Sequence, residues 1–319
     1  MKAVICTGYG TPEVLQIQEV PTPTPKDNEV LIRIIATAVN SGEVRIRKPD
    51  PKFFVKLMLG WNKPKYPILG VVFSGEIVQV GKDVTKFKVG DQVFGNTDMT
   101  FGTYAEYRCM KEDDALAIKP ESLSHAEAAV IPFGGTTALA FLRKAGLQSG
   151  HKILIYGASG AVGTAAVQIA KSLGAHVTGV CSTANVDMVK SLGADEVIDY
   201  TKENFSENGI IYDIIMDSVG KMSLTDATKS LSEDGILVLN SAMPGDMIHG
   251  LWLSMTSKRK VVMGGFTLTA ELMTYLKGLI ETGKLRPVID RTYTLDQIQE
   301  AHAYVEKGHK SGNVVVEIS

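Results

Sequence analysis

A glycine-rich segment in the middle of the chain has the residue types and spacing to hold a diphosphate. An apolar run, Lys152–Tyr156, leads into glycines 157, 160 and 163, and a helical pattern begins at Ala161. Glycine allows a sharp turn and close approach of the backbone, and a helix N-terminus offers unpaired N–H groups to phosphates. This strand–turn–helix context predicts a dinucleotide site formed by Gly157, Ser159, Gly160, Ala161, Val162 and Gly163.

The end of the following strand decides which dinucleotide fits. NAD sites usually carry an Asp or Glu about 20 residues after the glycine motif, where it binds the ribose 2′-hydroxyl. Here the strand over 175–181 leads into Ser182, Thr183 and Asn185, with no acid and no adjacent Arg or Lys. Hydroxyl and amide groups can donate to a 2′-phosphate, so the sequence favours NADPH over NADH. Ser182 and Thr183 could also simply cap the helix that begins near Val186.

The metal-binding residue types form no pattern. Zinc needs three or four converging nitrogen, sulfur or oxygen ligands, whereas the six histidines and three cysteines are scattered along the chain. His302 and His309 fall in and just after a helix that we expect at the surface, where both would be solvated. The sequence therefore predicts no metal site.

Two kinds of secondary structure position these residues. The first third of the chain has short apolar or alternating runs separated by glycine turns, such as 29–35, 71–80 and 92–94, which predict a barrel-like β domain. Ser124 and Glu127 then have the spacing of a capping box at the start of a helix. We expect that helix to break at Pro132 and a second helix to cover 135–144.

Strands and helices alternate from there to about Phe266, as in a doubly wound parallel sheet. The predicted strands are 152–156, 175–181, 196–200, 212–217, 235–240 and 260–263. The tail adds helices over 270–282 and 296–307 and strands over 292–295 and 313–318, too few for a domain. We therefore expect an α/β chain in which 123–265 form a Rossmann domain inserted into a β domain of 1–122 and 266–319.

The composition sets further bounds. The net charge of −2 gives no electrostatic reason to expect a nucleic acid or a membrane surface as partner. No apolar run reaches the length of about 18 residues that a membrane-spanning helix needs. The three cysteines, far apart and odd in number, argue against a disulfide framework and favour a reducing cytoplasm.

Several segments jointly resemble the medium-chain dehydrogenase/reductase family over essentially the whole chain. Besides the glycine motif, they are 38–42 (AVNSG), 67–70 (PILG), 75–77 (GEI), 90–93 (GDQV), 102–107 (GTYAEY), 137–138 (TA), 192–195 (LGAD) and 198–200 (IDY). In zinc enzymes of this family the catalytic ligands include an early cysteine and a Gly-His-Glu triplet. Asn40 and 70–72 (GVV) stand at the matching positions here, so the chain is more similar to the zinc-independent quinone oxidoreductases and enone reductases.

This resemblance implies a GroES-like β domain, a Rossmann domain, a homodimer and a set of cofactor contacts. Ser182, Thr183, Asn185 and Tyr200 would lie at the adenosine 2′-phosphate, where a lysine common in the family is replaced by Asn185 or Val186. Lys310 and Asn313 would close over the cofactor. The nicotinamide end would be lined by Asn40, Thr137, Ser218, Asn240, Ser241 and Phe266.

Without a metal, hydride transfer needs a well-placed acceptor carbon and a donor for the developing oxyanion. A quinone or an enone suits such a site better than a simple ketone. Asn40 and Tyr66 are the predicted catalytic donors, whereas Arg45 and Arg47, in the same part of the chain, are expected to be surface charges.

The apolar segment from Phe53 to Trp61 could roof the pocket for a small apolar substrate or form ordinary core. The predicted activity is NADPH-dependent reduction of a quinone or an α,β-unsaturated carbonyl compound. An alcohol dehydrogenase that uses NAD(P) with a replaced metal site, and a non-catalytic NADPH-binding protein, stay open as alternatives.

Overall fold

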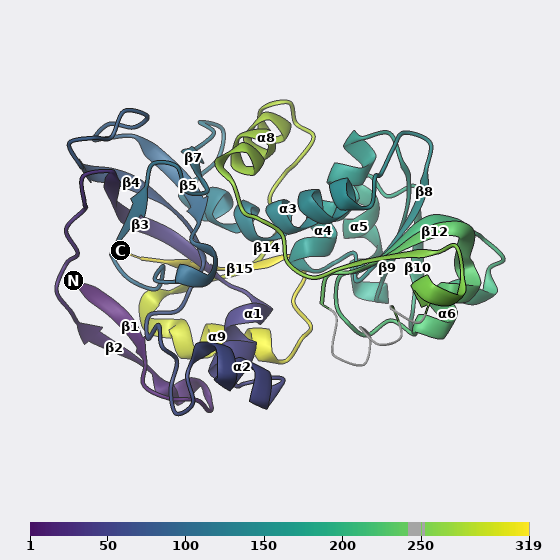
Figure 1. The fold of residues 1–319 in the computed structure, drawn as a ribbon, viewed down its shortest axis with the longest axis horizontal. Helices are drawn as coiled ribbons and strands as arrows, with labels where there is room; N and C mark the ends of the chain where they lie inside the picture. The colour runs from purple at the N-terminus through teal and green to yellow at the C-terminus, as the bar shows by residue number, and fades with distance from the viewer. Residues whose placement is uncertain (242–249, 251–252, 319) are drawn as a thin grey trace. The chain divides into compact units, whose positions relative to one another are not determined.

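A computed structural model describes residues 1–241, 250 and 253–318, without the side chain of Phe54 (Figure 1). The chain divides into two compact units. The first comprises Met1–Phe133, Leu268–Thr282 and Arg286–Ser319, and the second Gly134–Thr267 and Gly283–Leu285. The chain therefore leaves the first unit, builds the second and returns, in the order predicted from the sequence.

The first unit contains a seven-stranded sheet and a two-stranded one. The large sheet has the order β14-β15-β3-β4-β5-β7, with β6 on β3, and β1 pairs with β2. The strands are β1 (Lys2–Cys6), β2 (Leu15–Glu19), β3 (Glu29–Val39), β4 (Val72–Val80), β5 (Gln92–Asn96), β6 (Tyr107–Lys111), β7 (Leu116–Ile118), β14 (Ile289–Thr294) and β15 (Asn313–Glu317). The C-terminal strand β15 is antiparallel to β3, with Val314 opposite Val39.

Four α-helices belong to the first unit, with three short 3₁₀ turns. They are α1 (Ser41–Arg47), α2 (Lys52–Leu59), α8 (Ala270–Glu281), α9 (Ile298–Glu306), η1 (Pro12–Val14), η2 (Asp98–Thr100) and η5 (Leu295–Gln297). Apolar side chains of α9 pack into the main core of this unit with residues of β3, β4 and β15. Because α9 also contacts α1 (Figure 1), it connects the core to the segment that carries Asn40.

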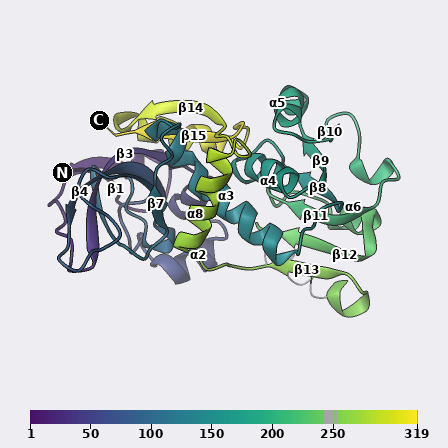
Figure 2. The same ribbon diagram turned by 90° about the horizontal axis from the view of Figure 1, so that it is seen from above.

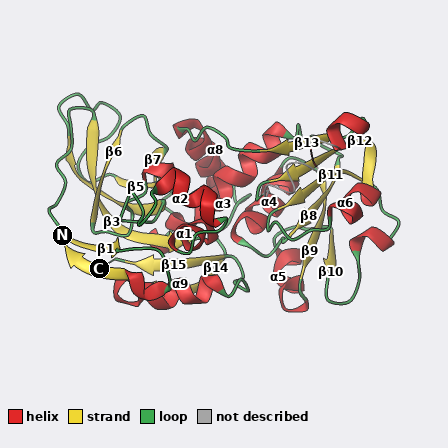
Figure 3. Ribbon diagram, turned by 60° about the horizontal axis from the view of Figure 1, so that its bottom comes forward, coloured by secondary structure: helices red, strands yellow, loops and turns green. Residues whose placement is uncertain are grey.

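The second unit is built on a six-stranded parallel sheet of order β10-β9-β8-β11-β12-β13. Its strands are β8 (Lys152–Tyr156), β9 (His176–Cys181), β10 (Glu196–Asp199), β11 (Tyr212–Asp217), β12 (Leu231–Leu239) and β13 (Lys260–Met263). The helical segments α4 (Ala161–Ser172), η3 (Thr183–Asn185), α5 (Val186–Ser191), η4 (Phe205–Glu207) and α6 (Leu224–Ser230) connect or flank them (Figure 3). This is the strand order of a Rossmann domain, and the predicted fold class is confirmed.

Helix α3 (His125–Lys144) corrects one prediction, because it runs without a break through Pro132 (Figure 2). Proline removes one backbone hydrogen bond and usually bends or ends a helix. Here helix residues before and after Pro132 are buried, as at Ile131 and Ala138. Their packing therefore offsets the backbone hydrogen bond that the proline cannot make. The capping box at its start is present, with the Glu127 carboxylate accepting from the Ser124 N–H at 2.8 Å.

The division between the units falls inside α3, after Phe133, whereas the sequence placed a boundary at residue 122. Ala129 and Val130 of α3 pack against Val72 and Val315, which belong to the sheet of the first unit. The first half of the helix therefore stays with the first unit. Among the helices in the described part of the chain, none has the length and apolar character to cross a bilayer.

Candidate functional site

The glycine turn after β8 is so tightly packed that two of its three glycines have no room for a side chain. Gly157 has φ of +79°, and a Cβ there would lie 1.9 Å from Cγ2 of Val219. A Cβ on Gly163 would lie 2.1 Å from the Gly157 carbonyl oxygen, because the first turn of α4 sits directly on the loop. Gly160 differs, since it is the N-cap of α4 and a Cβ there would meet nothing nearer than 3.6 Å. A methyl group at Gly160 would thus make only an ordinary contact, and the N–H groups of this helix N-terminus are of the kind that bind phosphates.

Other predicted cofactor residues follow the carboxyl ends of neighbouring strands of the same sheet, where doubly wound folds bind ligands. Ser218 comes after β11, and its hydroxyl donates to the Tyr156 carbonyl oxygen at 2.7 Å, which ties it to the glycine turn. Asn240 and Ser241 follow β12, and Oδ1 of Asn240 is buried without a hydrogen-bond partner among the described residues. Thr137 lies on α3, and the ring of Phe266 stands edge-on to that of Phe141 at 6.1 Å.

The loop after β9 carries the residues predicted to hold the adenosine side. The Asn185 amide donates to the Ser182 hydroxyl at 3.1 Å, and the Thr183 hydroxyl donates to Oδ2 of Asp199 at 2.5 Å. Tyr200, the residue after Asp199, has half of its surface exposed.

Asp199 was missed by the sequence analysis, which found no acid at this place. The carboxylate comes from β10, whose last residue is paired with Cys181 at the end of β9. It accepts hydrogen bonds from Thr183 and Thr201 and pairs with Lys202 at 3.2 Å, and these donors hold its pKa far below the usual range of a carboxyl. The sequence did contain a signal for this contact, because Asp199 lies near the end of the next predicted parallel strand and the ends of neighbouring parallel strands lie close together.

In the first unit, Asn40 forms the N-cap of α1. Its backbone N–H donates to Oε2 of Glu43 at 3.1 Å, and its amide nitrogen approaches Oε1 at 3.4 Å. Oδ1 of Asn40 faces the Glu43 N–H in this capping box but makes no aligned hydrogen bond, and it is buried. Burial raises the pKa of Glu43 to about 7. The sequence analysis also missed Glu43, although the spacing N-x-x-E is that of a capping box.

Asn313 lies next to Asn40, because Val314 and Val39 are opposite each other in the antiparallel pair of β15 and β3. Its amide nitrogen donates to the Val288 carbonyl oxygen at 3.0 Å, and its Oδ1 is buried without a partner among the described residues. Lys310 precedes this strand, and burial lowers its pKa to about 8. The structure thus brings Asn40 and Asn313 together from distant parts of the sequence.

Tyr66, the other predicted catalytic residue, is 39% exposed in the loop before β4, with its ring 5.9 Å from that of Phe101. The apolar segment of α2 is not ordinary core. Phe53, Leu57 and Met58 are 57–68% exposed, as is Trp61 just after the helix, and Leu59 is buried.

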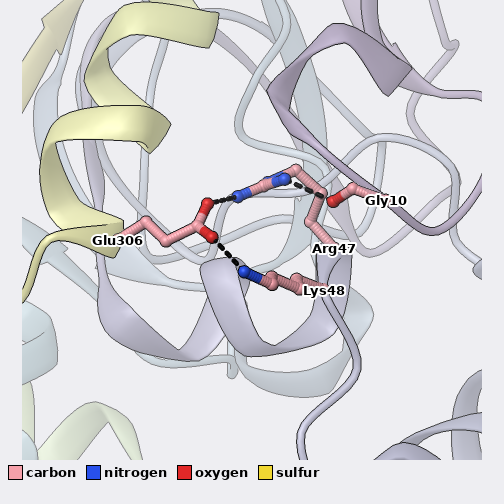
Figure 4. Close-up of polar contacts among 4 residues, drawn as sticks. All are labelled: Gly10, Arg47, Lys48 and Glu306. Carbon is pink, nitrogen blue, oxygen red and sulfur yellow. Dashed lines mark hydrogen bonds and ion pairs between the residues drawn. The ribbon is translucent and has the colours of Figure 1, made fainter.

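Two residues expected at the surface are buried instead. The Arg47 side chain is 0% exposed and donates to Oε2 of Glu306 and to the Gly10 carbonyl oxygen, both at 2.5 Å (Figure 4). Lys48 binds the other oxygen of Glu306 at 2.6 Å. His302 is 0% exposed, contacts the Tyr104 hydroxyl at 3.2 Å, and has its pKa lowered to about 3 by burial. The contacts of Glu306 with Arg47 and Lys48 fix α1 on α9, which the sequence of either helix alone does not reveal.

Two family models match the chain. "Alcohol dehydrogenase GroES-like domain" covers residues 26–120, and "Zinc-binding dehydrogenase" covers residues 192–316. The chain is 35% identical to 2-methylene-furan-3-one reductase of Solanum lycopersicum, over 99% of this chain and 79% of that one. It is 31% identical, with the same shares covered, to a chloroplastic NADPH-dependent alkenal/one oxidoreductase of Arabidopsis thaliana.

The structure of a quinone oxidoreductase from Coxiella burnetii is also similar. Its TM-score is 0.90, at 30% identity over 100% of this chain and 99% of that one. The chain belongs to the medium-chain dehydrogenase/reductase family, with a GroES-like β domain and a Rossmann domain. Among its relatives are quinone oxidoreductases and enone reductases, so the resemblance seen in the sequence is confirmed.

Proposed function

We propose that this chain is a zinc-independent reductase that passes a hydride from NADPH to a quinone or an α,β-unsaturated carbonyl compound. The observation that carries the proposal is the tight glycine turn before α4, where Gly157 and Gly163 leave no room for a side chain and Gly160 is the N-cap of the helix. The relatives' names supply the reaction class, since they include an NADPH-dependent alkenal/one oxidoreductase and a quinone oxidoreductase.

Buried amide oxygens support the fit of a nicotinamide cofactor. Oδ1 atoms of Asn240 and Asn313 are buried without a hydrogen-bond partner among the described residues, and a buried polar atom usually has one. The family resemblance assigns both residues, like Asn40, to the cofactor. A nicotinamide riboside carries the hydroxyl and primary amide donors that such oxygens need.

The bound cofactor would supply the hydride. The protein would bind the cofactor and the substrate, orient them, and polarise the substrate carbonyl group. The glycine turn, Ser159, Ala161 and Val162 would hold the diphosphate, while Thr137, Ser218, Ser241, Phe266 and Lys310 would enclose the nicotinamide end. Asn40 and Tyr66 are proposed to stabilise the oxygen of the acceptor. The Asn40 amide nitrogen approaches Glu43, so the carboxylate would keep that nitrogen, and hence the side chain, in one orientation.

Zinc independence is part of the proposal. Within residues 1–241, 250 and 253–318, no group of three or more His, Cys, Asp or Glu side chains is placed to hold a metal ion. An enone or a quinone delocalises the incoming negative charge onto an oxygen that water can protonate, so such a substrate needs less polarisation than a ketone. The exposed apolar side chains of α2 suit a small apolar substrate.

We also propose a cytoplasmic homodimer. The three cysteines are free, which suits a reducing compartment. Strand β13 ends the order of the parallel sheet, and an edge strand can pair with its copy across a two-fold axis.

The decisive assay follows NADPH oxidation with 1,4-benzoquinone, 9,10-phenanthrenequinone and a small enone, with and without EDTA. We expect turnover that EDTA leaves unchanged and that is faster with NADPH than with NADH at equal concentration. Loss of activity in EDTA would instead favour a metal-dependent alcohol dehydrogenase, in line with the description of one matching family model as a zinc-binding dehydrogenase. Saturable NADPH binding without turnover on any acceptor would indicate a binding protein.

A further inference from the structure

The 2′-phosphate of NADPH needs a cation, and the loop that follows β9 provides none. Residues 182–186 read Ser-Thr-Ala-Asn-Val and include no Lys or Arg. Hydroxyl and amide donors alone give little discrimination between a phosphate and a hydroxyl at the 2′ position. A further positive charge should therefore come from another part of the second unit.

Strand β10 brings such a charge to the loop. Asp199 ends this strand, and its register places it opposite Cys181, directly before Ser182. Oδ2 of Asp199 accepts the Thr183 hydroxyl at 2.5 Å and also pairs with the Lys202 ammonium at 3.2 Å. Because both contacts are made to the same oxygen atom, the Thr183 hydroxyl and the Lys202 ammonium lie close to each other.

Asp199 and Lys202 differ in their hydrogen bonds and in their exposure to solvent. The carboxylate also accepts from the Thr201 hydroxyl and N–H at 2.7 and 3.0 Å, so its charge is well compensated by donors on the protein. The Lys202 side chain is 67% exposed, whereas that of Asp199 is 9% exposed. The Lys202 ammonium is therefore accessible to an anion at this loop while it stays beside Asp199.

We propose that Lys202 is the cation that recognises the 2′-phosphate of NADPH, and that Asp199 is a positioning residue that holds Lys202 beside Thr183. The inference rests on the proposed dinucleotide site and names the residue that would select NADPH over NADH. It assigns the selective charge to the turn after β10 rather than to the loop after β9.

The test measures dissociation constants of NADPH, NADH and adenosine 2′,5′-bisphosphate by titration calorimetry. Lys202→Met should weaken binding of NADPH and of the bisphosphate about tenfold, as expected for one charge-assisted hydrogen bond, and leave NADH unchanged. The wild-type preference for NADPH should also shrink with rising salt, and it should shrink less in the variant.

Lys229→Met is the matched control. Lys229 is 65% exposed and pairs with Asp226 three residues before it, just as Lys202 pairs with Asp199. This variant should bind all three ligands like the wild type. Lys190→Met tests the nearest rival, the lysine on α5.

Three outcomes would overturn the inference. If NADPH preference survives in Lys202→Met, or is lost in Lys190→Met instead, Lys202 is not the selective cation, although the reductase proposal stands. If the wild-type chain binds NADH as tightly as NADPH, the preference itself is wrong. If it binds neither dinucleotide, the proposed function fails as well.

Discussion

Arg47 carries a full positive charge with none of its side chain exposed, and its counter-charge comes from Glu306 near the end of the chain. Removing one partner of a buried ion pair leaves the other charge uncompensated, which costs far more than the pair contributes as a whole. The arrangement also includes the Gly10 carbonyl oxygen, so three distant segments meet at one guanidinium.

Glu306→Gln should lower the free energy of unfolding by roughly 2 to 3 kcal/mol, because the amide leaves the Arg47 charge unpaired. Urea denaturation at neutral pH measures the change. Glu300→Gln is the control, since Glu300 is exposed on the same helix α9, and it should change the stability little. An equal loss in both variants would contradict a special role for the buried pair.

His302 should make the protein sensitive to acid. Burial lowers its pKa to about 3 in the folded chain, whereas an unfolded histidine titrates near pH 6.5. The unfolded state therefore binds one more proton between these values, so stability from this group is present above pH 6.5 and is lost as the pH falls toward 3.

In His302→Gln, the fall of the unfolding free energy between pH 6 and pH 4 should be shallower by up to about 1.4 kcal/mol per pH unit. Glutamine can keep a hydrogen bond to the Tyr104 hydroxyl. Urea midpoints at the two pH values give the slope. His176→Gln, which changes an exposed histidine, should retain the wild-type slope, and a wild-type slope in His302→Gln would refute the argument.

At the scale of elements, the turn between β8 and α4 offers a matched pair of glycines. A Cβ at Gly163 would collide with a backbone oxygen at 2.1 Å, whereas one at Gly160 meets nothing nearer than 3.6 Å. Gly163 therefore serves the packing of the loop itself, and Gly160 keeps space free in front of the helix.

Gly163→Ala should lower the melting temperature of the cofactor-free protein markedly. Gly160→Ala should change the cofactor-free stability by no more than about 1 kcal/mol, because alanine is only a poorer N-cap. Its methyl group should nevertheless weaken NADPH binding, seen as a smaller rise of the melting temperature on adding NADPH. A full rise in Gly160→Ala would place the diphosphate elsewhere.

Most elements could be predicted because their patterns are local. The apolar run 152–156 and the periodic helix after it are found at those positions, as are the strands 212–217 and 260–263. The predicted helix break at Pro132 was wrong, because the burial of residues before and after it in α3 outweighs the local effect of a proline.

The site was less predictable where it depends on pairing between segments. The contact of Thr183 with Asp199 requires β9 and β10 to be neighbours in register, and the burial of Arg47 requires a partner 259 residues away. The sequence pattern of one segment reveals neither which strands pair nor which distant residue faces Arg47. The glycine turn could be predicted because its sequence signal lies within one strand, loop and helix, although its contacts also include Val219 and Ser218 after β11.

At the scale of the whole molecule, the proposed dimer has a direct test. Light scattering at micromolar concentration should give about twice the mass of the 34.4 kDa chain. Hydrogen exchange should show protection of β13 that is lost on dilution, whereas β10, at the other end of the same sheet, should exchange alike at all concentrations. A monomeric mass would contradict the pairing of β13 with its copy.

The pairing of β15 with β3 also sets the order in which the chain can fold during synthesis. The ribosome releases β3 and Arg47 early, but their partners β15 and Glu306 follow more than 250 residues later. The parallel sheet of the second unit, from β8 to β13, is complete before either partner emerges. The nascent first unit must therefore wait with an unpaired strand edge and an unpaired arginine, which makes it the part of the newborn chain that most needs a chaperone.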